Sequence, residues 1–118
     1  MPHLHPALQI DVTSGPDAYL ICLHGELDIA GSPALDLALT EAEESEADRI
    51  LLDLEALAFI DACGLNVLSR AGQRSAGNGN RLWVSRGTGQ VASMLRLTGL
   101  DSSLPFANRT RSRIAEAA

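Results

Sequence analysis

ILLDLEALAFIDACGLNVLSRAGQRSA, residues 50–76, carries the clearest fold signal in the chain. Residues 50–54 are almost continuously apolar, which is typical of a strand in a sheet that is covered on a face. From about residue 63 to residue 76, apolar side chains such as Leu65 and Leu68 recur at helical spacing. A strand followed closely by an amphipathic helix predicts a βα unit of an α/β domain.

The flanking sequence extends this pattern in both directions. Upstream, apolar and polar residues alternate over 8–13, and residues 18–24 are largely apolar, so the turn composition at 14–17 predicts a β-hairpin. Ser32, interpreted as the cap, and Pro33 at the first helical position then predict a helix that ends near residue 45. The other predicted elements are a strand at 82–84 and a helix at 90–97.

The predicted element order is β β α β α β α, and its crossovers are long enough to join parallel strands. We therefore expect an α/β, two-layer domain with a four- to five-stranded mixed sheet and helices mainly on one face. A chain of 118 residues fits a single domain, 1–118. Its core should span about 8–106, with residues 1–7 and 108–118 loosely ordered.

Composition excludes several classes of protein. Hydrophobic residues make up 46% of the chain, which excludes disorder as the default state. An uninterrupted apolar run of about 20 residues, which crossing a bilayer requires, is missing from the sequence, so membrane insertion is not expected. The first residues lack the pattern of a signal peptide, which favours a cytoplasmic location. Two cysteines cannot form a disulfide framework, and a net charge of −6 argues against nucleic acid as the partner.

The charges are divided unevenly along the chain. Residues 1–61 carry thirteen acidic side chains and one arginine, whereas residues 62–118 carry two acidic side chains and eight arginines. This division has two interpretations: surface solubility with internal ion pairs, or an oriented surface for another protein.

The sequence holds no convincing set of catalytic or metal-ligating residues. His3 and His5 form an H-x-H pattern, but they sit at the terminus and lack further ligands. His24 ends a predicted strand and has no obvious carboxylate or nucleophile companion in the sequence. Residues 87–89, GTG, precede a helix but lack the lysine and longer glycine pattern of a phosphate-binding P-loop, so a plain turn is favoured. We expect no metal, no cofactor and no enzymatic activity.

Two loops carry more information than these isolated residues. GELD at 25–28 follows a central strand, and FIDACGL at 59–65 follows the next strand and opens a helix. Because sites collect at the carboxyl ends of neighbouring parallel strands, the two loops should lie side by side. Asp28 and Asp61 either cap helices and loops or belong to a shared site.

Three segments together carry a family resemblance: GELD at 25–28, DLEALAFIDACGL at 53–65 and MLRLTGLD at 94–101. Over about residues 8–106 the chain resembles a STAS domain of the bacterial anti-sigma factor antagonist type. The resemblance implies a regulator of transcription that binds an anti-sigma factor of the serine/threonine kinase type and so releases a sigma factor. In that family the kinase phosphorylates a hydroxyl at the start of the second helix, which breaks the complex.

The resemblance also implies roles for individual residues. Asp28 matches an acidic loop position near the kinase contact, Asp61 the acid before the phosphorylated site, and Gly64 the glycine after it. The phosphoacceptor position falls on Cys63, and Ala62 occupies another position that is often serine. The partner-binding set is therefore Asp28, Asp61, Ala62, Cys63 and Gly64, without the hydroxyl that phosphorylation needs.

Two other readings stay open. The missing hydroxyl favours a STAS subunit of another assembly, such as a stress-signalling complex or a lipid-transport ATPase. A small enzyme built on Cys63 would need a base near the thiol, for which His24 is the only candidate. Cys63 is otherwise a small packing residue or a redox-active thiol, whereas Cys22 is expected in the core. The sequence favours no particular oligomeric state.

Overall fold

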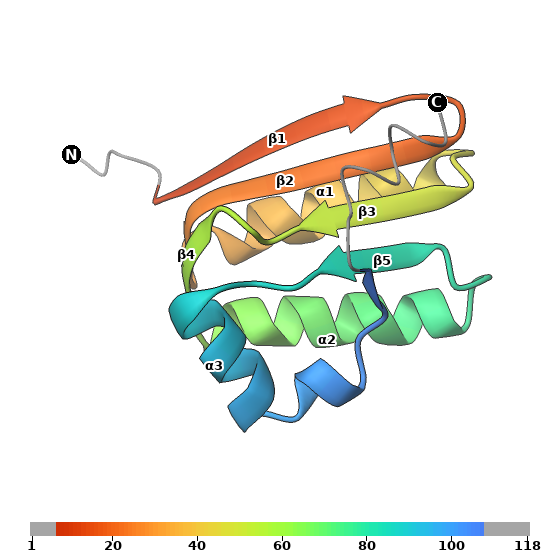
Figure 1. The fold of residues 1–118 in the computed structure, drawn as a ribbon. Helices are drawn as coiled ribbons and strands as arrows, with labels where there is room; N and C mark the ends of the chain where they lie inside the picture. The colour runs from red at the N-terminus through yellow and green to blue at the C-terminus, as the bar shows by residue number, and fades with distance from the viewer. Residues whose placement is uncertain (1–6, 108–118) are drawn as a thin grey trace.

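The computed structural model describes residues 7–107. His3 and His5 lie outside the described residues, as do the two tails expected to be loosely ordered, except for Ala7. Figure 1 shows the path of the chain. The elements in order are β1 (Leu8–Ser14), β2 (Ala18–Leu27), α1 (Ser32–Glu44), β3 (Arg49–Asp53), β4 (Leu57–Ile60), α2 (Ala62–Ala76), β5 (Leu82–Ser85), α3 (Gly89–Leu97), the 3₁₀ turn η1 (Leu100–Ser102) and β6 (Phe106–Ala107).

The strands form one mixed sheet in the order β1-β2-β3-β5-β6, with β4 attached to β2. β1 runs antiparallel to β2, as the hairpin predicts, and the other pairs are parallel. The α/β class and the mixed sheet are thus confirmed. The sheet has six strands, because the short β4 and β6 add to those expected from sequence.

Strand β2 divides its pairing between two parallel neighbours. Its first half pairs with β3 from Ala18 to Cys22, and its last residues pair with β4 after an irregularity at Gly25 and Glu26. At this point Glu26 N donates to the carbonyl of Ala7 at 2.7 Å. Gly25 has φ +93° and its Cα faces that carbonyl so closely that a side chain has no room. The irregularity directs the end of β2 toward β4.

Helices α1 and α2 pack on the same face of the sheet through their predicted apolar stripes. Leu35 and Leu39 of α1 and Leu65 and Leu68 of α2 are all buried in the main hydrophobic cluster. Figure 1 shows both helices running alongside the strands of the sheet. The inward-facing strand residues of this cluster include Ile21, Leu23, Ile50, Leu52, Leu82 and Val84.

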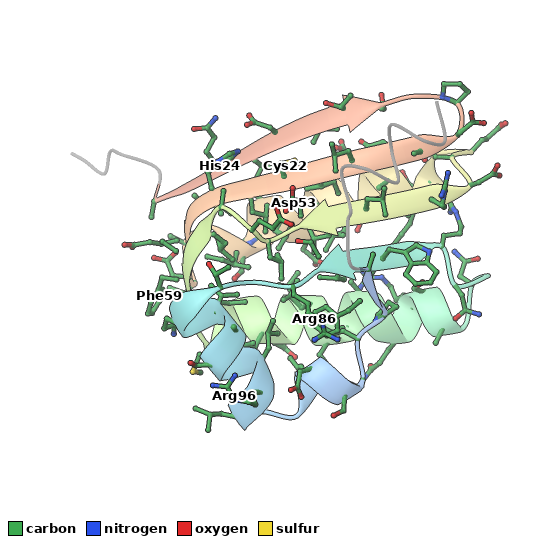
Figure 2. All side chains as sticks on the ribbon, in the orientation of Figure 1. Cys22, His24, Asp53, Phe59, Arg86 and Arg96 are labelled. Carbon is green, nitrogen blue, oxygen red and sulfur yellow. The ribbon has the colours of Figure 1, made fainter. Side chains whose placement is uncertain are left out.

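The opposite face of the sheet carries a polar cluster centred on Asp53. The Ser85 hydroxyl donates to the Asp53 carboxylate at 3.0 Å, and the Cys22 thiol lies 3.8 Å from its other oxygen. Cys22 is buried, as expected. His24, further along β2, pairs with Asp11 at 3.2 Å, and Figure 2 labels Cys22, His24 and Asp53 on this face.

Two arginines from the basic half of the chain bind the end of α1. Arg81 donates to the main-chain carbonyls of Glu43, Ser45 and Ala47, where the helix leaves its carbonyl groups without intrahelical partners. Arg74 of α2 binds the Glu43 carboxylate through two nitrogens at 3.0 Å. This hydrogen bond raises the pKa of the Arg74 guanidinium above its usual value. Some of the basic side chains of the second half of the chain therefore pair with the acidic first half inside the domain.

Candidate functional site

The loops after β2 and β4 lie side by side, as the parallel geometry predicts. Leu27 and Ile60, the last residues of the two strands, are direct partners in the sheet. The link continues one residue further, because Asp61 N donates to the carbonyl of Leu27 at 3.1 Å. Asp28 and Asp61 thus leave neighbouring strands at the same edge.

Asp28 organises the loop that leads into α1. Its carboxylate accepts hydrogen bonds from Ala30 N at 3.0 Å and Gly31 N at 3.2 Å. Its main-chain carbonyl accepts from the Ser32 hydroxyl at 2.8 Å. The predictions of Ser32 as the helix cap and of Pro33 as the first helical residue were wrong by one position: Gly31 is the cap, and Ser32 and Pro33 are the first two helical residues. The Asp28 carboxylate binds the amides of Ala30 and Gly31, which precede the helix, and the Ser32 hydroxyl turns back to the Asp28 carbonyl instead of capping.

Asp61 caps α2. Its backbone is extended, and its carboxylate accepts from Gly64 N at 3.1 Å. This is the ordinary geometry of an N-cap, and it places a negative charge where the helix dipole favours one. Ala62 and Cys63 are therefore the first two residues of the helix, with Ala62 exposed and Cys63 partly exposed.

Gly64 is required by packing. A Cβ atom at this position would lie 2.7 Å from Leu27 Cγ and 2.8 Å from Ile60 Cγ1. The first turn of α2 therefore rests directly on the ends of β2 and β4, and only glycine allows that approach. This contact fixes Cys63 relative to both loops.

An open groove connects Cys63 with the loop after β2. Its volume is about 340 Å³. Residues from the β2–α1 loop and α1 form one wall, and residues of α2 form the other. The lining residues are Ile29, Ser32, Pro33, Asp36, Cys63, Asn66, Val67 and Arg70.

The groove contains residues that the sequence reasoning missed. Ile29 is 72% exposed although it is a large apolar residue. A large apolar side chain between Asp28 and the small residues Ala30 and Gly31 was a readable signal. Asn66 and Arg70 follow Cys63 at spacings of three and seven residues, which places all three on one face of a helix.

In the part of the chain that the structure describes, no group of three or more His, Cys, Asp or Glu side chains is placed to hold a metal ion. None of the helices within residues 7–107 is long and apolar enough to span a bilayer.

This fold and this edge define a class of small α/β domain in which the first turn of a helix, packed through a glycine, meets an acidic loop from the neighbouring strand. The chain belongs to the STAS domain family, whose family model matches residues 9–117.

Solved structures with the same fold include three whose names describe them as anti-sigma factor antagonists. An anti-sigma factor antagonist from Mycobacterium paratuberculosis is 22% identical, with a TM-score of 0.76 and 93% of each chain covered. The unphosphorylated anti-sigma factor antagonist SpoIIAA is 21% identical, with a TM-score of 0.68 and coverage of 95% of this chain and 99% of that one. An anti-sigma factor antagonist (STAS) domain protein from Planctomyces limnophilus is 16% identical, with a TM-score of 0.70 and coverage of 92% of this chain and 97% of that one.

Proposed function

We propose that this protein is an anti-sigma factor antagonist that binds an anti-sigma factor of the serine/threonine kinase type and so frees a sigma factor. The proposal depends on one observation. Asp28 and Asp61 follow paired strands at one edge of the sheet, and Cys63 and the exposed Ile29 line the adjoining groove. The similar solved structures named as antagonists support the same function. Such a protein acts by binding, without catalysis, in the bacterial cytoplasm.

The edge has the composition of a docking surface. Ile29 offers an apolar anchor at the mouth of the groove, and large side chains that enter a partner's pocket supply most of the energy of an interface. Asp28, next to Ile29 in the chain, and Asp61 at the same sheet edge add negative charge, which speeds association with a basic partner surface and fixes its orientation. Ala62 is exposed and Cys63 partly exposed, so the two present a small, closely approachable surface, whereas Gly64 is buried and supports it from below.

A phosphate on residue 63 would disrupt this surface. It adds about −1.5 to −2 charges at neutral pH, next to two carboxylates that are already there. The helix N-terminus tolerates the charge within the domain, but a partner fitted to the unmodified surface meets both bulk and repulsion. Cys63 has no hydroxyl to accept the phosphate, so we propose an antagonist that stays available for binding and is not released by phosphorylation at this position.

The test is calorimetric titration against each kinase-fold anti-sigma factor encoded in the same genome. The wild type should bind one of them, and Ile29→Lys should abolish binding because it replaces the apolar anchor with a charge. Leu97→Lys is the matched control, since Leu97 is 78% exposed but does not line the groove. Absence of binding to every such factor would refute the proposal, as would equal effects of the two substitutions.

A second candidate function is a subunit of another STAS-containing assembly, such as a stress-signalling complex or a lipid-transport ATPase. It is favoured by one observation: neither Ala62 nor Cys63 carries a hydroxyl. Affinity purification from the native cell separates the two functions. A kinase-type anti-sigma factor in the eluate supports the first, and transporter or stress-complex components support the second.

A further inference from the structure

A second hollow lies between the end of β5, helix α3, η1 and β6. Its volume is about 210 Å³, and it shares no lining residue with the groove at Cys63. It is lined by Arg86, Gly87, Ala92, Leu95, Arg96, Asp101 and Phe106. Figure 2 labels its two arginines, Arg86 directly after β5 and Arg96 on α3.

Both arginines of this hollow keep their hydrogen-bonding capacity. Arg86 lies over the Phe106 ring, 4.6 Å from its centroid, which orients the guanidinium without using its N–H donors. Arg96 makes one long hydrogen bond, 3.4 Å, to the Ser93 hydroxyl. Neither arginine has an ion-pair partner among residues 7–107, in contrast to Arg74, which has two.

Asp101 supplies the one carboxylate of the lining. It accepts a long hydrogen bond of 3.5 Å from the neighbouring Ser102 hydroxyl and, within the described chain, pairs with neither arginine. The hollow therefore presents two guanidinium groups and one acceptor. A ligand that satisfies all three groups carries an anion at one end and a hydroxyl at the other.

We propose that this hollow binds a small phosphate monoester that bears a hydroxyl group. Guanidinium groups bind phosphate oxygens through paired, charge-assisted hydrogen bonds. The hollow is smaller than the roughly 300–1,000 Å³ of pockets that enclose drug-sized ligands, which suits a phosphorylated compound of a few carbons better than a nucleotide. Gly87 packs this wall tightly against α3, because a Cβ there would lie 2.5 Å from Val91 Cγ1.

The experiment is a titration of the whole protein, followed by backbone amide NMR shifts, with glycerol 3-phosphate, inorganic phosphate and glycerol as probes. Glycerol 3-phosphate should shift the amides around Arg86, Gly87 and Arg96 saturably, phosphate should do so more weakly, and glycerol should not. Absence of a saturable shift with glycerol 3-phosphate overturns the proposal.

Three substitutions test the residues. Arg96→Gln, at an exposed position of α3, should weaken glycerol 3-phosphate binding by about tenfold or more, the usual effect of losing a charge-assisted hydrogen bond. Arg49→Gln is the control, since it makes the same change in net charge outside both the hollow and the groove at Cys63. Asp101→Asn should strengthen binding of phosphate and reduce the preference for glycerol 3-phosphate. Equal weakening by Arg49→Gln and Arg96→Gln, or an unchanged preference in Asp101→Asn, overturns the site.

Discussion

Gln90, at the start of α3, binds both main-chain polar groups of Ile60, the last residue of β4. Its Oε1 accepts from Ile60 N at 2.9 Å, and its Nε2 donates to the Ile60 carbonyl at 2.9 Å. Among the strands of residues 7–107, β4 pairs with β2 alone. The side-chain amide therefore takes the place of a second strand neighbour, immediately before the Asp61 cap.

Replacement of Gln90 by alanine should loosen this end of β4. Two partly buried main-chain groups lose their partner, and each such loss costs about 1–3 kcal/mol when water does not replace it. We expect a lower free energy of unfolding in urea and faster hydrogen exchange of the Ile60 amide. Gln73→Ala, at an exposed position of α2, is the control. Unchanged exchange at Ile60 would show that the amide does not support β4.

Substitution of Gly64 by alanine tests the close approach of α2 to the strand ends. The added methyl group overlaps Leu27 and Ile60, and overpacking of this kind destabilises by about 1–3 kcal/mol. Gly77→Ala is the matched control, because a Cβ there meets only carbonyl oxygens at 3.8 Å or more. Equal stability of the two variants in thermal denaturation contradicts the packing role of Gly64.

Asp61 is expected to have a structural and a binding role that two substitutions separate. Asp61→Ala removes the cap of α2 and should cost about 0.5–2 kcal/mol. Asp61→Asn keeps a capping oxygen and removes the charge, so stability should stay near that of the wild type while anti-sigma factor binding weakens. If Asp61→Asn binds as the wild type does, the charge has no part in docking.

Arg81→Lys should destabilise the protein although the charge is kept. The planar guanidinium reaches the carbonyls of Glu43, Ser45 and Ala47 together, and a lysine ammonium cannot reproduce this fork. Loss of even one of these bonds is expected to cost about 1–3 kcal/mol. Arg70→Lys serves as the control for chemical denaturation, and a similar loss in both variants would argue against a specific role of Arg81.

Cys63→Ser is expected to create a phosphoacceptor for the cognate kinase. Wild type and variant are incubated with the kinase and ATP, and the modified residue is located by mass spectrometry. Phosphate should appear on residue 63 of the variant only, because kinases place an oxygen for in-line transfer. Phosphorylation of the wild type at another hydroxyl, with release of the partner, would show that the switch has moved to that residue.

Most of the fold is predictable because local pattern and tertiary packing agree in this chain. The stripes of Leu35 with Leu39 and of Leu65 with Leu68 have helical spacing in the sequence and are buried against the sheet. Strand β4 was not predictable in the same way. Its four residues do not alternate in burial, and its pairing depends on the irregularity at Gly25 and Glu26, a contact distant in sequence.

The candidate site, like the fold, was predictable from the sequence only in part. The parallel arrangement of the strands predicted that the loops of Asp28 and Asp61 lie side by side, and the Leu27–Ile60 pairing confirms it, although the pairing is made by β4, which was not predicted. The wall supplied by α1 was missed, because the crossing of two helices is set by packing and is not visible in either helix alone. Ser32 was misassigned because its hydroxyl donates back to the carbonyl of Asp28, four residues earlier, and the helix begins one residue sooner than expected.

The steric demand of Gly64 has an evolutionary consequence for its neighbour. Because position 64 bears the tight contact with Leu27 and Ile60, residue 63 is free to change between side chains of similar size without repacking the domain. Cysteine and serine codons differ by a single base. Under the proposed function, gain of a phosphoacceptor at residue 63 therefore needs one base change and no repacking of Leu27 and Ile60.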